Sequence, residues 1–215
     1  MTLTLEITNF ANRPSVCILI MTKKKAKEIR KEEIVQAAVQ EFLERGYEGA
    51  SMDNIARRAS LSKGGLYHHF RSKDEILIYA NNKLSVPEEE IFRRILLNRS
   101  MEKGLKEFIS AYVSYWSDNK ENLKFYFLSM VKAFEDEKLS DLYRRYAEDV
   151  FEMLESMFEM GMQNREFREH NPTGRSTALI SAINGMLGYM MLGVGPSGPE
   201  IITHFQKIFI DEILI

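Results

Sequence analysis

Hydrophobic residues recur at intervals of three and four along most of this chain, which is the spacing of one buried face on an amphipathic helix. In the first clear example, over about residues 24–45, Ile34, Ala38 and Phe42 share a face, and glutamates and glutamines occupy the other. Gly46 follows directly, at the position where a left-handed residue commonly ends a helix. The pattern predicts an N-terminal helix that buries one stripe and ends at Gly46.

Two short helical patterns follow, each preceded by a serine that can cap a first turn. Ser51 precedes the first, over about residues 52–58, and Ser62 precedes the second, which ends near Phe70. Two short helices joined by a turn of three or four residues and packed beneath a longer helix are typical of a helix-turn-helix. The sequence thus predicts this DNA-binding motif over about residues 51–70.

The rest of the chain is predicted to be helical almost throughout, because no run shows the alternation of a half-buried strand. Apolar stripes with helical spacing lie within about residues 105–116, 123–134, 139–157, 179–191 and 202–209. The expected fold class is all-α, with an N-terminal three-helix domain at residues 23–75 and a larger helical domain at residues 76–215. Residues 1–22 are predicted to be a disordered or non-native extension.

The formal net charge of −2 does not by itself indicate a nucleic-acid partner, but the charge is unevenly distributed. Residues 21–75 contain twelve lysines and arginines against nine acidic residues, whereas residues 76–215 contain sixteen against twenty-one. The basic excess therefore coincides with the predicted helix-turn-helix. The lysine run at 23–27 is either a solvated helix start or a flexible arm that touches DNA. Met21, just before it, is hypothesised to be the natural first residue.

Composition and motifs exclude several other classes. Cys17 is the only cysteine, which excludes a disulfide within one chain and a cysteine-based zinc site. No apolar run is long enough for a membrane span or a secretory signal, so we expect a cytoplasmic protein without a membrane partner. Signatures of hydrolases and phosphate loops are absent, which argues against an enzyme. We expect no cofactor and no metal site, because His68 and His69 are adjacent and point about 100° apart on a helix.

The second short helix carries side chains that suit a DNA groove. Gly64 and Gly65 each destabilise a helix by roughly 1 kcal/mol relative to alanine, which indicates close approach to another surface. The other candidates on this helix are Ser62, Lys63, Tyr67 and His68. Ser51 at a helix N-terminus and Lys73 at the start of the next helix are candidates for phosphate contacts.

A close resemblance to the DNA-binding domain of the tetracycline-repressor (TetR) family lies in residues 46–56 (GYEGASMDNIA) and 62–73 (SKGGLYHHFRSK). The resemblance implies a helical homodimer whose N-terminal domain binds a palindromic operator. It implies a C-terminal domain that binds a small effector and dimerises through its last two helices. It implies phosphate contacts by Ser51, Lys63, Tyr67, His69 and Lys73. It implies base-facing positions at Ser62, Gly64, Gly65 and His68.

Beyond residue 80 the resemblance extends only to the architecture, so effector contacts are predicted from the inward faces of the middle helices. The candidates are large side chains that suit a lipophilic effector: Tyr112, Trp116, Phe127, Met130, Phe134, Tyr146 and Met157. Helices at about residues 174–194 and 199–214 are predicted to form the dimer interface, because both are apolar on more than one side. The expected function is a repressor that its effector releases from DNA. The alternative is a helix-turn-helix regulator without a small ligand, whose C-terminal domain only dimerises or binds a protein.

Overall fold

The computed structural model describes residues 14–84, 91, 94–95 and 100–215, with the side chains of the first helix described from Lys27 onward. Within these ranges the chain is all-α, as predicted. It divides into two compact units, with the boundary after Ala80, close to the predicted boundary after residue 75. In the described ranges, no helix combines the length and the apolar character that crossing a bilayer requires.

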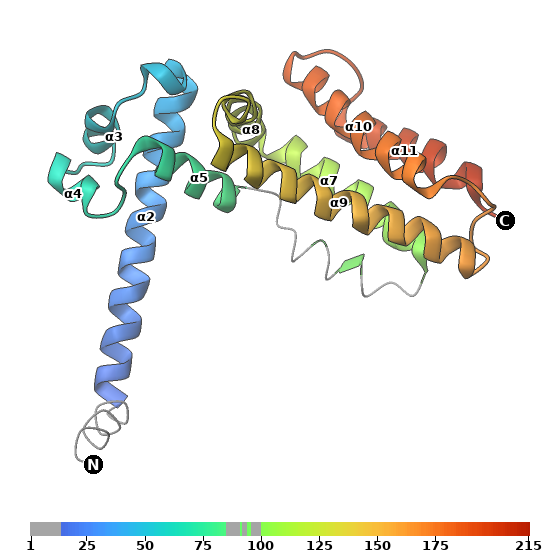
Figure 1. Cartoon of the computed structure of the whole chain (residues 1–215), viewed down its shortest axis with the longest axis horizontal. Coiled ribbons are helices and arrows are strands. Elements are labelled where there is room, and N and C mark those ends of the chain that lie inside the picture. Colours follow the sequence, from blue (N-terminus) through green and yellow to red (C-terminus); the bar gives the residue numbers. More distant parts are fainter. Residues whose placement is uncertain (1–13, 85–90, 92–93, 96–99) are drawn as a thin grey trace. The chain divides into compact units, whose positions relative to one another are not determined.

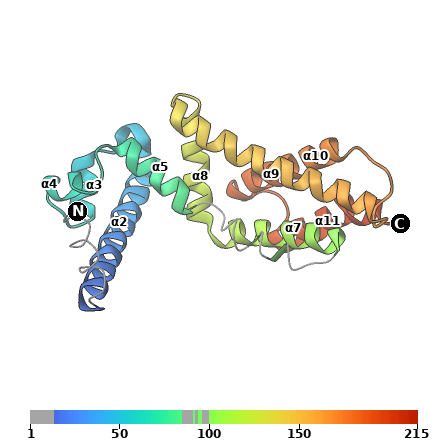
Figure 2. The same cartoon turned by 60° about the horizontal axis from the view of Figure 1, so that its bottom comes forward.

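The first unit holds the helices of the predicted helix-turn-helix (Figures 1 and 2). Its helices are α2 (Pro14–Gly49), α3 (Met52–Arg58), α4 (Lys63–Tyr67) and the greater part of α5 (Lys73–Leu84). The predicted stripe of Ile34, Ala38 and Phe42 is confirmed, since all three side chains are completely buried. Ile55 of α3 and Leu66 of α4 are also completely buried, and α3 packs against both α2 and α4.

The two ends of α2 compare differently with the sequence. Its C-terminal end confirms the prediction, because Gly46 has a φ of +70° and interrupts the helical backbone there. The beginning of α2 differs from the prediction, since the helix starts at Pro14 rather than near residue 24. Residues 14–22 of the predicted extension therefore lie in a helix. Residues 1–13 lie outside the described part of the chain.

From residue 100 onward, the second unit is a bundle of five longer helices, which Figures 1 and 2 show in yellow-green to red. They are α7 (Met101–Asp118), α8 (Lys120–Ala133), α9 (Glu137–Gln163), α10 (Pro172–Met191) and α11 (Gly198–Phe209), followed by a 3-10 turn at Asp211–Ile213. α9 packs against α7, α8 and α10, and α11 packs against α7 and α10. The predicted stripe of α7 is confirmed, because all its members are buried: Leu105, Phe108, Ile109, Tyr112, Val113 and Trp116.

α8 corrects one predicted stripe. Val131 and Phe134 were expected on its buried face, but they are 67% and 86% exposed. The buried face instead passes through Phe125 and Ser129. The Ser129 hydroxyl lies 2.7 Å from the backbone oxygen of Phe125 and 2.9 Å from the hydroxyl of Tyr143. These hydrogen bonds satisfy a buried polar group, so an outward apolar run was mistaken for the core face.

The segment between α9 and α10 holds the C-terminal end of the chain. The backbones of Phe167 and Leu214 form an isolated antiparallel bridge, and the N–H of Arg168 donates to the oxygen of Ile213 at 2.8 Å. The Phe167 ring is buried directly over Gly161 of α9, where a β-carbon would lie only 2.1 Å from it. The absence of a side chain at Gly161 therefore lets this loop close on the bundle.

The same segment caps α7. The carboxylate of Glu166 accepts hydrogen bonds from the Ser100 hydroxyl at 2.7 Å and from the N–H groups of Met101 at 3.1 Å and Glu102 at 3.0 Å. These N–H groups have no partner within the helix, and the helix N-terminus favours a negative charge. Burial would raise the pKa of Glu166, but the hydrogen bonds from Ser100 and the two N–H groups outweigh burial and lower it.

Candidate functional site

The turn between α3 and α4 fixes the start of the predicted recognition helix. Ser60 has a φ of +54°, so the chain leaves α3 through one residue in the left-handed region. The N–H of Ser60 donates to the oxygen of Arg57 at 3.1 Å, and that of Leu61 donates to Ala56 at 2.8 Å. The backbone of the turn is thus satisfied internally, and the orientation of α4 on α3 is defined by hydrogen bonds as well as by packing.

Both predicted serine caps are confirmed. The Ser51 hydroxyl oxygen accepts from the N–H of Asn54 at 3.2 Å, and that of Ser62 accepts from the N–H of Gly65 at 3.1 Å. A serine hydroxyl that accepts a hydrogen bond still carries a hydrogen to donate. Each serine can therefore cap its helix and contact an oxygen of a partner at the same time.

The exposed face of α4 is open. Lys63, Gly64 and His68 are exposed, and Tyr67 is 44% exposed. No heavy atom lies within 4 Å of the position that a β-carbon on Gly64 would occupy, whereas a β-carbon on Gly65 would lie 3.2 Å from the Leu61 side chain. The two predicted glycines therefore differ: Gly64 leaves an open surface, while Gly65 lets α4 pack on its own turn.

Two of the predicted DNA contacts already have partners in the protein. The Lys63 ammonium lies 2.9 Å from a carboxylate oxygen of Asp53, and this hydrogen-bonded pair raises the pKa of Lys63. The Lys73 ammonium donates to the backbone oxygen of Tyr47 at 2.8 Å and lies 4.2 Å from the centre of the Tyr47 ring. Lys63 is on the surface, but Lys73 is only 25% exposed and stabilises the end of α2. This packing role of Lys73 was missed because its partner is a distant backbone oxygen.

His69, the remaining predicted phosphate contact, follows α4 and is partly buried. Its Nδ1 atom is buried without a hydrogen-bond partner among the described residues, and its ring meets that of His68 edge-on at 5.3 Å. Burial lowers the pKa of His69, and the positive fields of His68, Lys27, Arg30 and Lys31 lower it further. Of the three α2 residues, Lys27 was predicted only as part of the lysine run at 23–27, and Arg30 and Lys31 were not predicted as site residues. Their spacing of three and four was the signal, because it places them on one helix face.

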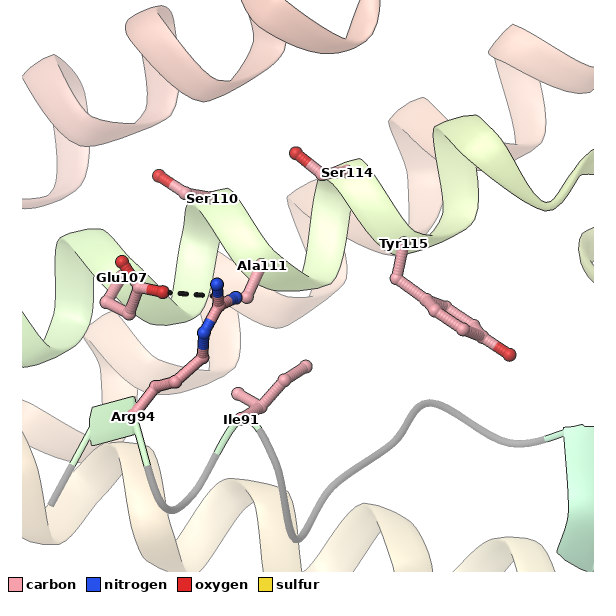
Figure 3. A pocket seen from close by; sticks show the side chains of 7 residues that line it. All are labelled: Ile91, Arg94, Glu107, Ser110, Ala111, Ser114 and Tyr115. Atoms are coloured by element: carbon pink, nitrogen blue, oxygen red, sulfur yellow. Dashed lines mark ion pairs between the residues drawn. The ribbon is translucent and has the colours of Figure 1, made fainter.

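The second unit contains a hollow of about 470 Å³ along α7, lined by Ile91, Arg94, Glu107, Ser110, Ala111, Ser114 and Tyr115. Arg94 and Glu107 form an ion pair at 3.4 Å within it. Figure 3 shows Glu107, Ala111 and Tyr115 on the side of α7 that faces Ile91, while Ser110 and Ser114 point away from Ile91. The polar groups of this hollow therefore do not converge on one point.

None of the seven predicted effector residues lines this hollow. Tyr112, Trp116 and Met157 are buried in the core of the second unit, where Phe127 and Tyr146 pack against them more loosely. Met130 and Phe134 lie on the surface, 36% and 86% exposed. The structure thus brings five of the seven into one core and leaves two of them outside it. Their contact with an effector stays a prediction.

Taken together, α3, its tight turn and α4 form a helix-turn-helix, the class of DNA-binding motif that places its second helix in the major groove. Residues 34–80 match the family described as bacterial regulatory proteins, tetR family. The first unit is therefore similar to the DNA-binding part of tetR-family regulators.

Known proteins resemble the two units to different extents. The transcriptional regulator PksA of Bacillus subtilis (strain 168) is 41% identical over 75 residues, which is 35% of each protein. The chain thus matches about a third of the length of such curated relatives.

Solved structures cover far more of the chain, at low identity. AibR, solved with isovaleryl coenzyme A and operator DNA, covers 84% of this chain and 98% of its own, with a TM-score of 0.68 and 19% identity. A transcriptional regulator from Saccharomonospora viridis, solved with choline, covers 86% and 97%, with a TM-score of 0.73 and 17% identity.

Proposed function

We propose that this chain is a repressor that binds a palindromic operator through α4 and is released from it by a small effector. The observation that carries the DNA-binding part is the open face of α4. Gly64 leaves a backbone surface with no heavy atom within 4 Å of its missing β-carbon, and the exposed Lys63 and Tyr67 flank it. A groove floor can approach such a surface closely, while the lysine and the tyrosine hydroxyl reach phosphates.

Within this proposal the residues divide into two roles. Ser62, Gly64, Gly65 and His68 face the bases, and Ser51, Lys63, Tyr67, His69 and Lys73 position the motif on the backbone. When the protein binds DNA, the Lys63 ammonium leaves its ion pair with Asp53 and forms one with a phosphate. Its contribution to the affinity is therefore the difference in free energy between the two ion pairs. Lys73 has to contact a phosphate while its ammonium also holds the end of α2, which makes it the weakest of these candidates.

The test is DNA binding by the double variant Lys63→Ala, Tyr67→Ala, measured against a duplex enriched by in vitro selection with the wild-type protein. We expect about a 10- to 100-fold weaker affinity, and a salt slope that is smaller by about 1, because one phosphate contact by a cation is lost. Lys138→Ala is the control, since Lys138 is exposed in the second unit. Unchanged DNA binding by the double variant would contradict the proposed surface.

The proposed dimer uses the exposed apolar side chains of the last two helices. Tyr189 of α10 is 57% exposed, Leu192 and Val194 just after it are 75% and 58% exposed, and Ile208 of α11 is 47% exposed. A second copy of the chain covers this face and places two recognition helices about 34 Å apart, one turn of DNA. We expect Leu192→Glu to give a monomer by light scattering, whereas Val131→Glu, at an apolar position on α8 that is 67% exposed, leaves the dimer intact. A wild-type monomer at micromolar concentration would refute the interface.

The proposed effector binds the second unit. Support comes from the two solved relatives of the same fold that hold isovaleryl coenzyme A and choline, and from the hollow along α7. An effector that prefers a dimer spacing incompatible with the operator weakens DNA binding by the same factor by which DNA weakens effector binding. A thermal-shift screen over lipophilic acids, acyl thioesters and quaternary amines tests this. No shift with any class would favour a regulator whose second unit only dimerises or binds a protein.

A further inference from the structure

We infer that Glu41 of α2 and Arg58 of α3 are positioning residues: their ion pair fixes the orientation of α4, and discrimination between the operator and other DNA depends on it. This inference rests on the proposed DNA binding and specifies how selectively, rather than how strongly, the protein binds. Both residues belong to the first unit, and neither was predicted as a site residue.

The first observation is a buried carboxylate on α2. Glutamates were predicted for the polar face of this helix, yet Glu41 is only 2% exposed. One of its carboxylate oxygens lies 3.1 Å from an Nη atom of Arg58 and 3.2 Å from the Nε atom. The other oxygen lies 2.8 Å from Nε of Arg45, but it accepts no hydrogen bond of regular geometry among the described residues. The carboxylate is thus removed from water with one of its oxygens incompletely hydrogen-bonded.

Arg58 is also bound by a second carboxylate of α2. Its guanidinium donates two hydrogen bonds to Glu44, one turn further along the helix, and one of them measures 2.9 Å. The side chain of Glu44 is 51% exposed, whereas that of Glu41 is 3% exposed, so water competes only for the outer contact. A planar guanidinium that spans two carboxylates is held in direction as well as in distance. The end of α3 therefore has one preferred placement on α2.

The placement of the end of α3 determines that of α4. Arg58 is the last residue of α3, and the left-handed Ser60 of the tight turn follows two positions later. The backbone oxygen of Ala59, between them, accepts a hydrogen bond at 3.2 Å from Arg30 of α2. α3 packs against α2, and α4 packs against α3. A rotation of α3 on α2 is therefore carried over to α4.

The physical chemistry of a buried ion pair indicates what this contact supplies. Compared with apolar side chains of similar volume, such a pair adds little stability, because the loss of hydration offsets the attraction. Apolar side chains can repack in several arrangements, whereas a guanidinium and a carboxylate hydrogen-bond well in few. Hydrogen bonds to base edges require placement within about 0.5 Å, while the long side chain of Lys63 can follow a displaced phosphate. Loosening α3 should therefore weaken binding to the operator more than binding to other DNA.

The main test is the double variant Glu41→Leu, Arg58→Met, which removes the buried carboxylate together with its partner. We expect a melting temperature within a few degrees of the wild type. The affinity for the selected duplex should fall about tenfold, as for one disrupted base contact, while the affinity for a scrambled duplex stays the same. The salt slope should also be unchanged, because no phosphate contact is removed. The control is Asp141→Leu, Arg144→Met, which removes an exposed ion pair of α9 and should leave all these quantities at their wild-type values.

A second variant, Arg58→Lys, tests the inference independently of how the double variant folds. Lysine keeps the positive charge, and with it any direct attraction to DNA, but an ammonium cannot span both carboxylates with the fixed geometry of a guanidinium. We expect a several-fold loss of discrimination between the selected and the scrambled duplex, again with an unchanged salt slope. Fluorescence anisotropy at several salt concentrations measures both quantities.

The outcomes separate this inference from the proposed function. Wild-type discrimination in Arg58→Lys, or in the folded double variant, overturns the positioning role and leaves the proposed DNA binding intact. A double variant that binds both duplexes equally more weakly, with a salt slope smaller by about 1, identifies Arg58 as a phosphate contact and also overturns that role. If the wild-type protein binds no duplex, the proposed function fails as well.

Discussion

Gly64 of α4 and Gly161 of α9 show how differently the two units use the same residue. A β-carbon on Gly64 would meet no heavy atom within 4 Å, whereas one on Gly161 would lie 2.1 Å from the Phe167 ring. Gly64 is exposed in a helix of only five residues, and Gly161 is buried in a helix of 27 residues. At Gly64 the first unit leaves open space on its surface, whereas at Gly161 the second unit fills the space with the Phe167 side chain.

This difference explains why the sequence predicts more about the function of the first unit than about that of the second. The match to the tetR family lies in residues 34–80, and the proposed DNA contacts are surface residues of that segment. The second unit carries a core of apolar and aromatic side chains that can be exchanged as long as volume and pattern are kept. Its fold is accordingly shared with solved regulators at 17% and 19% identity.

The largest expected effect is that of Gly161→Ala. The new methyl group must displace the buried Phe167 ring, and overpacking of this kind costs about 2–3 kcal/mol of unfolding free energy. Denaturation followed by the fluorescence of Trp116 measures it, because this single tryptophan lies in the core of the second unit. Gly185→Ala is the control, since no heavy atom lies near its missing β-carbon. Equal stability of the two variants would show that the loop over Gly161 yields easily.

The next effect is that of Glu166→Gln, which weakens the cap on α7. We expect a loss of about 1–2 kcal/mol near neutral pH, because a charged acceptor at a helix N-terminus is replaced by a neutral one. Since the pKa of Glu166 in the folded protein lies below its ordinary value of 4.5, the wild-type advantage is complete above that value. It is lost as the pH falls through the lowered pKa.

Denaturation at several pH values checks this prediction. Glu169→Gln serves as the matched control, because Glu169 is exposed on the same loop. A difference between wild type and Glu166→Gln that does not shrink in acid would mean that the carboxylate acts by packing rather than by charge.

The smallest effect on stability, and the one with the opposite sign, is that of Gly64→Ala. Alanine fits the open space and favours the helix, so the first unit should gain up to about 1 kcal/mol. DNA binding should nevertheless weaken, because the methyl group occupies the surface that approaches the groove. Circular dichroism on heating and anisotropy with the selected duplex measure the two effects. A variant that is both more stable and a better DNA binder would remove the proposed reason for this glycine.

Local features of the first unit were predictable, because they depend on residues a few positions apart. The caps by Ser51 and Ser62 and the left-handed Gly46 all follow from residue type and neighbouring pattern, and the structure contains each of them. The buried stripes of α2 and α7 were predictable for the same reason, since helical periodicity alone defines a face.

Features that depend on distant partners were not predictable. The stripe at the end of α8 was placed on the wrong face because Ser129 is buried through a hydrogen bond to Tyr143 on α9. The ammonium of Lys73 supports a backbone oxygen 26 residues away, and Glu166 caps a helix whose first N–H groups lie 64 and 65 residues before it. No periodicity within either segment encodes such a pair.

The sequence by itself therefore determined the class of fold, the helix-turn-helix and the resemblance of that motif to the tetR family, because caps, glycines and helical stripes act over one or two turns. Only the tertiary structure decided which polar groups are already engaged, which apolar side chains remain exposed, and which cations lower the pKa of His69. These features depend on segments of the chain that are brought together by the burial of a common core. Burial stabilises any set of apolar residues of suitable volume, but it does not specify which polar residues meet at the edge of the core.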